Sequence, residues 1–189
     1  MNELGDDFAG VLRAAAAGDR PAFARLWESA HPGLVRYLRV VCGPDAEDIA
    51  SETWMKAMRG LATFSGDEPS FRGWLAVIAR NHLADVRRRA TRRPERLRPE
   101  IDDQALPLAG DTAELAIEQL STDQALRLVA SLPPATAEMV ALRVVVGLDV
   151  AQVAQIVGRS PGAVRVAVHR GLRALAGQVD PDGATHGGL

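Results

Sequence analysis

Apolar residues recur at steps of three and four along most of the chain, the spacing that places them on one face of an α-helix. The pattern is clearest from Phe71 to Val86, where His82 joins the apolar side chains on the same arc. No segment alternates apolar and polar residues as a half-buried strand would. The sequence therefore predicts an all-α fold.

Capping and breaking residues divide the N-terminal half into helices. Asp19 is suited to cap a helix, and we expect His31-Pro32 to interrupt that helix before Gly43-Pro44 ends it. Residues 45–58 predict a further helix, because the carboxylates in its first turn complement the helix dipole. Residues 60–69 have the composition of a loop.

A helix-turn-helix pattern lies near the C-terminal end, after two predicted helices at 123–131 and 135–146. Asp149 can cap a short helix, Gly158-Arg159 forms a tight turn, and Ser160-Pro161 starts a second helix as N-cap and first helical residue. One arc of this second helix holds Val164, Val168, Gly171, Leu172 and Leu175. The other arc is basic and holds Arg165, His169, Arg170 and Arg173.

Charge is distributed very unevenly along the chain, although the net charge is only −2. Residues 70–100 contain nine arginines against three acidic residues, a local charge of +6. Residues 101–123 contain six acidic residues and no basic one, and residues 143–175 carry five arginines against one aspartate. Taken alone, these runs favour solvated helix faces, and the alternative is two nucleic-acid-binding surfaces separated by an acidic spacer.

The acidic segment and its prolines predict a division into two small helical domains. We expect one domain at 1–91, a flexible linker at 92–120, a second domain at 121–177 and a disordered tail at 178–189. A chain of 189 residues can bury only a modest core in each of two domains. Large multi-domain enzymes are excluded.

Few residues in the sequence suggest a catalytic or metal-binding site. Cys42 is the single cysteine, so no internal disulfide can form, and the four histidines are too far apart in sequence to suggest a metal site. We find neither a base placed to activate Cys42 nor a glycine-rich phosphate loop, and we expect no catalytic residues and no cofactor. No apolar run is long enough to cross a membrane and the start lacks signal-peptide order, which favours a cytoplasmic protein.

A basic face on the second helix of a helix-turn-helix is the geometry that enters a DNA major groove. There arginine can pair with guanine or hold phosphates, and small residues at the helix start permit close approach. A plain helical hairpin with solvated arginines is the alternative explanation.

The N-terminal half carries a more specific signal. DAEDIASETW, a loop containing Phe64, and FRGWLAVIARNHLADVRRR follow one another, and the segment LPPATAEMVALRVVVGLDVAQVAQIVGRSPGAVRVAVHRGLRALA lies beyond the acidic stretch. In these blocks, about Pro21–Arg89 and Asp123–Leu175, the chain resembles the bacterial RNA polymerase sigma factors of the sigma-70 family. It is most similar to the extracytoplasmic-function (ECF) group, which keeps a sigma2-like and a sigma4-like domain.

The resemblance implies a surface for core RNA polymerase on the helix at 45–58. In the family this helix docks on a coiled coil of the largest polymerase subunit, and the second domain meets the flap. The implied core-polymerase contacts are Asp48, Glu52, Thr53, Met55 and Lys56. An exposed Trp54 would add interface area, and core packing is its alternative role.

The resemblance also implies recognition and opening of the promoter −10 element by residues 61–70 and the helix after them. The family's loop captures a flipped base, which needs a pocket to recover the lost stacking. The implied −10 contacts are Phe64, Ser65, Gly66, Asp67, Arg72, Arg80, Asn81, Arg87 and Arg88. Phe71 and Trp74 border this region, and we expect both in the core, since they lie on the apolar stripe.

The second domain is implied to read the −35 element through the helix that begins at Pro161. The implied contacts are Ser160, Pro161, Gly162, Ala163, Arg165, Val166, His169, Arg170 and Arg173. Gln152, Ala163 and Gly171 depart from the family, which often has Glu, Thr and Ala there. Ala163 therefore lacks a hydroxyl for a phosphate contact, and Gly171 lowers helix stability by about 1 kcal/mol relative to Ala.

The implied function is that of a promoter-specificity subunit, and the implied partners are core polymerase, promoter DNA and an anti-sigma factor that covers the DNA-binding domains. The acidic linker is implied to thread into the polymerase channels. Neither a small-molecule substrate nor membrane insertion is expected. The alternative is a helix-turn-helix regulator that binds operator DNA without polymerase, and an enzyme is disfavoured by the absence of catalytic motifs.

Overall fold

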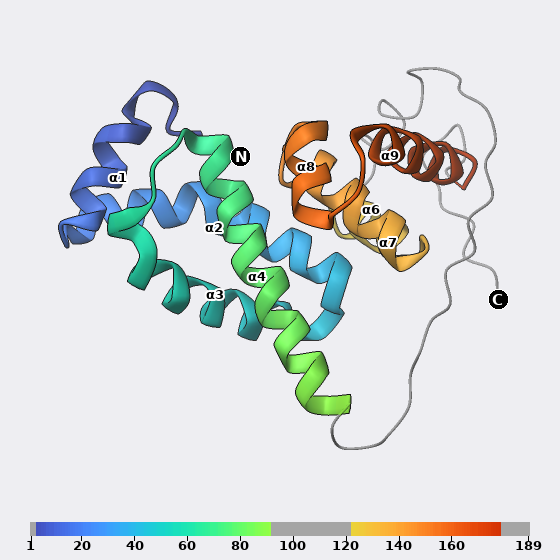
Figure 1. Ribbon diagram of the computed structural model, residues 1–189, viewed down its shortest axis with the longest axis horizontal. Helices are drawn as coiled ribbons and strands as arrows, with labels where there is room; N and C mark the ends of the chain where they lie inside the picture. Colours follow the sequence, from blue (N-terminus) through green and yellow to red (C-terminus); the bar gives the residue numbers. More distant parts are fainter. Residues whose placement is uncertain (1–2, 92–121, 179–189) are drawn as a thin grey trace.

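A computed structural model describes residues 3–91 and 122–178, and every regular element in these ranges is helical (Figure 1). The N-terminal unit, residues 3–91, comprises η1 (Gly5–Asp7), α1 (Phe8–Ala16), α2 (Arg20–Cys42), η2 (Gly43–Asp45), α3 (Ala46–Gly60), η3 (Leu61–Thr63) and α4 (Glu68–Thr91). The C-terminal unit, residues 122–178, comprises α6 (Thr122–Ala130), α7 (Pro134–Val140), η4 (Ala141–Val145), α8 (Val150–Val157) and α9 (Pro161–Ala176). The all-α prediction is confirmed, while the predicted linker and nearly all of the predicted tail lie outside the described residues.

The capping residues act as the sequence predicts. The Asp19 carboxylate accepts a hydrogen bond from the Ala22 backbone N–H at 2.8 Å. At the start of α8, Asp149 and Gln152 form a reciprocal capping box, with distances of 2.8 and 2.9 Å. These bonds satisfy backbone donors that have no partner within the helix, and so they set where each helix begins.

Pro32 does not interrupt α2, contrary to the prediction. The helix continues from Arg20 to Cys42 with Pro32 inside it. Proline removes the N–H that would bond the carbonyl four residues earlier, on Glu28. Glu28 and Pro32 are both exposed, so water can serve this carbonyl.

The connection between α3 and α4 is shorter than the loop predicted at 60–69. Leu61–Thr63 form one 3-10 turn, and α4 already begins at Glu68. Pro69 is tolerated because it lies in the first turn, where backbone N–H groups need no helical partner. A loop of only four residues, 64–67, remains between the two helices.

The helix predicted at 135–146 changes its winding midway. It begins as α7 at Pro134 and continues as a π-helical turn over Ala141–Val145. The π turn packs inward at Leu142, and Leu148 in the connection to α8 is fully buried as well. The C-terminal unit therefore forms its core from α7, this π turn and α9.

The C-terminal unit depends on a close approach between α7 and α9 at Gly171. A Cβ added at Gly171 would lie 2.8 Å from Val140 Cγ2 and 2.9 Å from Thr136 Cγ2. Real Cβ atoms do not come this close to their neighbours, so the contact requires a residue without a side chain. Close packing against α7 thus explains why this chain has glycine at position 171, where the family often has alanine.

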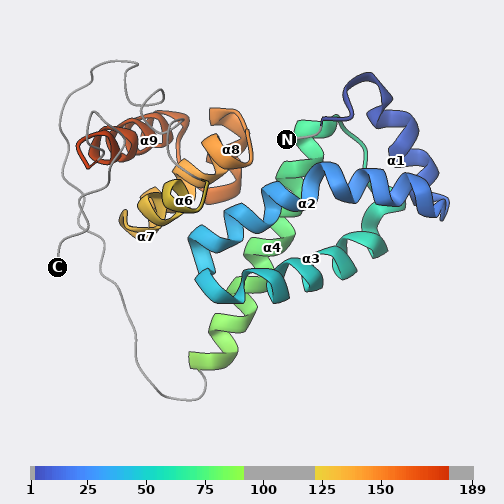
Figure 2. The same cartoon turned by 180° about the vertical axis from the view of Figure 1, so that it is seen from behind.

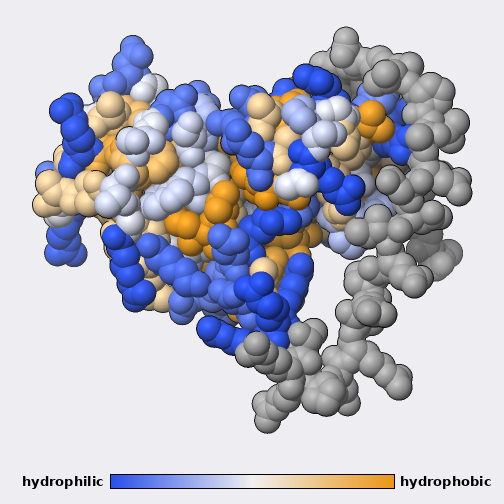
Figure 3. Space-filling view, viewed as in Figure 1, coloured by the Kyte–Doolittle hydropathy of each residue, from blue (hydrophilic) through white to orange (hydrophobic). Residues whose placement is uncertain are grey.

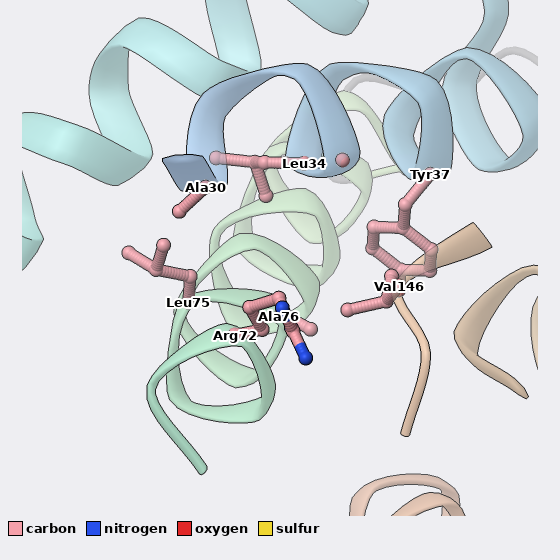
Figure 4. A pocket seen from close by; sticks show the side chains of 8 residues that line it. Ala30, Leu34, Tyr37, Arg72, Leu75, Ala76 and Val146 are labelled. Atoms are coloured by element: carbon pink, nitrogen blue, oxygen red, sulfur yellow. The ribbon is translucent and has the colours of Figure 1, made fainter. Parts of the chain in front are cut away.

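The two units pack against each other rather than standing apart (Figures 1 and 2). Helix α2 lies against α6, α7 and η4, and α4 lies against α8. A small cavity remains at this junction, and Val146 of the C-terminal unit lines it with Leu34, Tyr37 and Leu75 of the N-terminal unit (Figure 4). The division into two domains did not predict this packing.

Replacing Gly171 by Ala is expected to destabilise the fold by about 1 to 3 kcal/mol, because the added methyl overpacks the contact with α7. Gly162, in the same helix, has no atom within 4 Å of its Cβ position. Gly162→Ala is therefore the matched control and should be neutral or stabilising by about 0.4 to 1 kcal/mol. Urea unfolding followed by circular dichroism measures both, and equal midpoints for the two variants would contradict the packing role.

Candidate nucleic-acid interface

The four-residue loop before α4 brings together the predicted −10 residues Phe64, Ser65, Gly66 and Asp67. Gly66 has a φ of 155°, and a Cβ there would lie 3.1 Å from both Phe64 Cζ and Ser70 Cβ. The Asp67 carboxylate accepts a hydrogen bond from the Ser70 backbone N–H at 2.8 Å, at the start of α4. Hydrogen bonding from Ser70 lowers the pKa of Asp67, which keeps this carboxylate charged at the helix N-terminus.

An aromatic cluster packs against the buried side of the loop of residues 64–67. The Phe71 ring is fully buried, with ring centroids of Phe64 and Trp74 at 5.4 and 5.7 Å. Phe8 of α1 and Trp54 of α3 approach the same ring at 5.8 and 6.2 Å. Phe64 is half-buried while residues 65–67 are exposed, so the cluster holds one side of the loop and leaves the other to solvent.

Arg72 lies in the interior, in contrast to the loop. Its side chain is 8% exposed and pairs with Glu68 at 3.7 Å and with Glu3 at 3.4 Å. Glu68 also accepts hydrogen bonds from the Leu4 and Gly5 backbone N–H groups at 3.0 and 3.1 Å. These contacts hold the N-terminal segment against the start of α4. Arg72 could contact DNA only if its ion pairs with Glu68 and Glu3 were broken.

The remaining −10 residues follow α4 toward its C-terminal end. Asn81, Arg87 and Arg88 are exposed, Arg87 donates to the Val41 carbonyl at 2.9 Å, and Arg88 pairs with Asp85. Arg80 is half-exposed and donates from Nε to the Glu138 carboxylate at 2.9 Å. The structure thus presents a basic edge on α4, with Arg80 engaged by the C-terminal unit.

Helix α3 brings four of the five predicted polymerase contacts to one surface. Asp48, Glu52 and Met55 are exposed at helical spacing, and Met55 is 43% exposed. Lys56 is half-buried, with its Nζ 2.7 Å from His82 Nδ1. Thr53 is fully buried and donates its hydroxyl to the Ile49 carbonyl at 2.7 Å, so it does not reach this surface.

Burial lowers the pKa of His82, and the neighbouring Lys56 charge lowers it further. The neutral imidazole can accept the Lys56 hydrogen bond at Nδ1, which a protonated ring could not do. Trp54 is buried as well, in a T-shaped contact with Phe23 at 5.8 Å, which confirms its alternative role in the core.

Helices α8 and α9 form the predicted helix-turn-helix. Gly158 adopts the left-handed conformation that ends α8, with φ 70° and ψ 37°, and the Ser160 hydroxyl accepts from the Ala163 N–H at 3.2 Å. Val164 and Leu175 are fully buried beneath α9. The predicted −35 residues are distributed over the outer face, where exposed members are Ser160, Pro161, Gly162, Ala163, Arg165, Val166 and Arg173.

His169 and Arg170 complete that set at half-buried positions. The start of α9 has small residues and exposed backbone, which suits close approach to a phosphate or a base edge. Arg165 and Arg173 are two helical turns apart on the same exposed side. This arrangement can place a basic helix in a major groove.

Two carboxylates with structural roles were missed by sequence reasoning, Glu68 and Glu138. Their partners are far away along the chain: Leu4 is 64 residues from Glu68, and Tyr37 is 101 residues from Glu138. The acidic first turn of α4 could have indicated a role for Glu68 within its own helix, but no local pattern identifies such distant partners.

Within residues 3–91 and 122–178, no helix is both long and apolar enough to cross a bilayer. The same part of the chain contains no group of three or more His, Cys, Asp or Glu side chains that could hold a metal ion.

Two family models match the chain, in the order of the two units. The model described as Sigma-70 region 2 matches residues 22–93, and the model described as Sigma-70, region 4 matches residues 122–175. Together they cover the elements that carry the candidate surfaces.

Curated relatives match over most of the chain. The ECF RNA polymerase sigma factor BldN of Streptomyces coelicolor is 35% identical to this chain. The matched part covers 92% of this chain and 66% of the length of BldN. The ECF RNA polymerase sigma factor SigD of Mycobacterium tuberculosis is 33% identical over 95% of this chain and 87% of its own. ShbA of Streptomyces griseus, also an ECF RNA polymerase sigma factor, is 34% identical over 89% of this chain and 94% of its own.

Solved structures share the fold at lower identity. CnrH, in complex with the cytosolic domain of CnrY, superposes with a TM-score of 0.59 at 23% identity and covers 91% of this chain and 96% of its own. The sigma factor RpoE, in complex with the anti-sigma factor NepR from Bartonella quintana, has a TM-score of 0.54 at 22% identity, with coverages of 81% and 95%.

Proposed function

The chain belongs to the sigma-70 family of RNA polymerase sigma factors, in its extracytoplasmic-function group, and from that premise we propose which surfaces meet polymerase and promoter. It is a transcription initiation factor that binds core RNA polymerase and directs it to promoters. The observation that carries this function is the occurrence of region 2 and region 4 in order in one chain. A regulator that binds operators without polymerase would have no use for region 2, and that alternative is set aside.

We propose that core polymerase binds the outer side of α3 through Asp48, Glu52, Met55 and Lys56. The support is a surface that mixes carboxylates with exposed apolar area, including Met55 and the 51% exposed Met58. Such a mixed composition suits a protein interface, where methionine is enriched. Thr53 is buried under this surface, and its role would be to hold α3 in place.

The proposed −10 surface is the loop of residues 64–67 together with the basic edge of α4. A flipped base costs a few kcal/mol of stacking, and contact with the loop would offset it. The half-buried Phe64 and the exposed Ser65, Gly66 and Asp67 support this assignment. Asn81, Arg87 and Arg88 would follow the DNA strand along α4, and Arg72 would act indirectly by fixing the N-terminal segment.

The proposed −35 surface is the outer face of α9. Ser160, Pro161, Gly162 and Ala163 would approach the backbone closely, and the side chains beyond them would reach base edges and phosphates. Those side chains are Arg165, Val166, His169, Arg170 and Arg173. The exposed basic arc over a buried apolar one is the observation that supports it.

We further propose that the protein performs no chemistry of its own and acts in the cytoplasm, where polymerase is found. CnrH and RpoE were solved with protein partners, and for RpoE the partner is an anti-sigma factor. By extension, a protein partner would hold this chain inactive by covering its basic surfaces.

Affinity capture of the protein from its native cells under unstressed conditions should recover a second protein in stoichiometric amount. The basic edge of α4 and the outer face of α9 provide the charge that such a partner would neutralise. Recovery of polymerase alone would contradict the proposal of an inhibitory partner.

Replacing Arg165 and Arg173 by Ala should weaken upstream-element recognition by about 1 to 3 kcal/mol for each base contact removed. Run-off transcription with core polymerase on randomised promoters measures this, since the wild type should select two spaced elements and the variant only the downstream one. Arg127→Ala removes an exposed arginine from α6 and is the matched control. Unchanged promoter selection by the double variant would contradict the assignment of these arginines to the −35 surface. If the wild type gave no specific transcript at all, that result would contradict sigma function.

Asp48→Arg should weaken association with core polymerase by roughly tenfold or more, because it reverses a charge on the proposed surface. Circular dichroism should remain unchanged, since Asp48 is exposed. Glu28→Arg makes the same change at an exposed position of α2 and should bind normally. If the wild type, Asp48→Arg and Glu28→Arg all co-eluted equally with polymerase, α3 would not be the docking surface.

A further inference from the structure

We propose that the N-terminal segment, residues 3–16, braces the −10 loop of residues 64–67 and thereby sets how well this loop captures a flipped base. The proposal rests on the proposed function, because base capture is the role assigned to that loop. The segment lies outside the match to Sigma-70 region 2, which begins at residue 22. Its contacts reach the chain on both sides of the loop.

The first contact is a carboxylate held by two consecutive backbone N–H groups. Glu68, the first residue of α4, accepts hydrogen bonds at Oε2 from the N–H groups of Leu4 and Gly5 at 3.0 and 3.1 Å. Leu4 is in the right-handed helical region, with φ −80° and ψ −22°, whereas Gly5 has a φ of 53°. Successive residues of opposite hand turn their N–H groups to one side and form an anion-binding nest. The buried Glu68 carboxylate is the anion in this nest.

Arg72, one turn further along α4, strengthens this attachment. Its guanidinium pairs with Glu68 at 3.7 Å and with Glu3 at 3.4 Å. The side chains of Arg72 and Glu68 are only 8% and 9% exposed. Breaking a buried pair is costly, because the charge left behind stays buried. Residues 3–5 are therefore fixed to the first turn of α4, directly after the loop.

The same segment also contacts the chain before the loop. Helix α1 packs against η3, the 3-10 turn that leads into Phe64. Phe8, the first residue of α1, is buried, and its ring centroid lies 5.8 Å from that of Phe71. The loop is thus held at η3 on one side and at Glu68 on the other, and Phe64 packs on Phe71 between them. A four-residue loop with both ends fixed has few conformations left.

A loop that is ordered in advance favours base capture. Contacts with the loop have to recover the stacking that a flipped base loses, and the entropy of ordering a mobile loop would offset part of that recovery. The brace acts at the first turn of α4. Figure 3 shows strongly hydrophilic residues along the half of α4 toward its C-terminal end, and Arg87 and Arg88 of the basic edge belong to that half. Loosening the segment should therefore impair base capture and leave phosphate contacts intact.

Gly5 offers a variant that acts through the backbone alone. Among the described residues, no atom beyond its chain neighbours lies within 4 Å of its Cβ position, so Gly5→Ala creates no clash. Alanine at a φ of 53° is strained, however, and disfavours the nest. Gly5→Asn introduces a residue that tolerates the left-handed conformation and should behave as the wild type does.

Two further variants complete the design. Gly10→Ala, in α1, is the matched control, since its Cβ position is equally open and alanine favours a helix over glycine. Glu68→Gln is a second, independent variant of the latch, and it removes the charge from the nest while it keeps an acceptor oxygen.

Hydrogen exchange of the full chain, followed by mass spectrometry, measures the brace directly. In Gly5→Ala and Glu68→Gln, the amides of residues 3–7 and of the two flanks of the loop should exchange roughly three- to tenfold faster, because the nest opens more often. The flanks hold protected amides at Phe64 and Phe71, which donate to the carbonyls of Leu61 and Asp67. Exchange in α3 and α9 should not change, and Gly10→Ala and Gly5→Asn should match the wild type.

Promoter opening tests the functional consequence. A promoter selected by run-off transcription, with 2-aminopurine in its −10 element, fluoresces more strongly when the base leaves the stack. With core polymerase, Gly5→Ala and Glu68→Gln should open this element roughly three- to tenfold less well. Polymerase association and −35 selection should equal those of the wild type, a separation that a general loss of stability would not produce. The double variant should be no worse than the weaker single variant, since both changes act through the same two hydrogen bonds.

Unchanged hydrogen exchange in Gly5→Ala would overturn the brace, and so would faster exchange in Gly10→Ala of the same size. Faster exchange with unchanged promoter opening would overturn its effect on base capture. Additive losses in the double variant would overturn the role of the Glu68 nest, and if Glu68→Gln lost helical content by circular dichroism, Gly5→Ala alone would decide. Failure of the wild type to give a specific transcript would contradict the proposed function itself, and hydrogen exchange would still decide the brace.

Discussion

The burial of the Phe71 ring is the constraint on which the N-terminal unit depends. Aromatic side chains from α1, α3, α4 and the loop of residues 64–67 all meet this ring, and Phe23 of α2 joins them through Trp54. Large aromatic rings bury much area at little cost in rotamer entropy, so one residue can fix several elements. The loop can stay exposed and still keep its shape because Phe64 is held in this cluster.

Features determined by neighbours in sequence could be predicted from sequence. The caps at Asp19 and Asp149 depend on residues three positions apart, and both are present. The apolar stripe of α4 is buried at Phe71, Leu75 and Ala79, whereas Val86, predicted on the same face, is 38% exposed. Thr53 and Arg72 were assigned to surfaces, and the structure places both in the interior. Their burial is set by packing against other helices, and for Arg72 by Glu3, 69 residues away in sequence. No periodicity contains that information.

Charge organisation explains how one chain can present nucleic-acid surfaces at a net charge of −2. Arginines lie on the proposed DNA surfaces of α4 and α9, while several acidic residues serve as caps or ion-pair partners, as Asp149, Glu68 and Glu138 do. Glu138 has the further property that its partner Arg80 belongs to a proposed DNA surface. Arg80 thus joins the two units through its Nε while its side chain stays 41% exposed.

Tethering determines how strong the contact between the units has to be. Because both units belong to one chain, each experiences the other at an effective concentration in the millimolar range. A contact with a millimolar dissociation constant would then be about half formed, and a few additional hydrogen bonds would make the packed arrangement of the units predominant without making it permanent. The interface between the units contains the Glu138 carboxylate that bridges Tyr37 and Arg80, an ion pair between Asp123 and Arg39 at 3.6 Å, and the packing of Leu148 against Gly73. The proposed polymerase surface on α3 lies outside this interface, since Asp48, Glu52 and Met55 are exposed while the units are packed together.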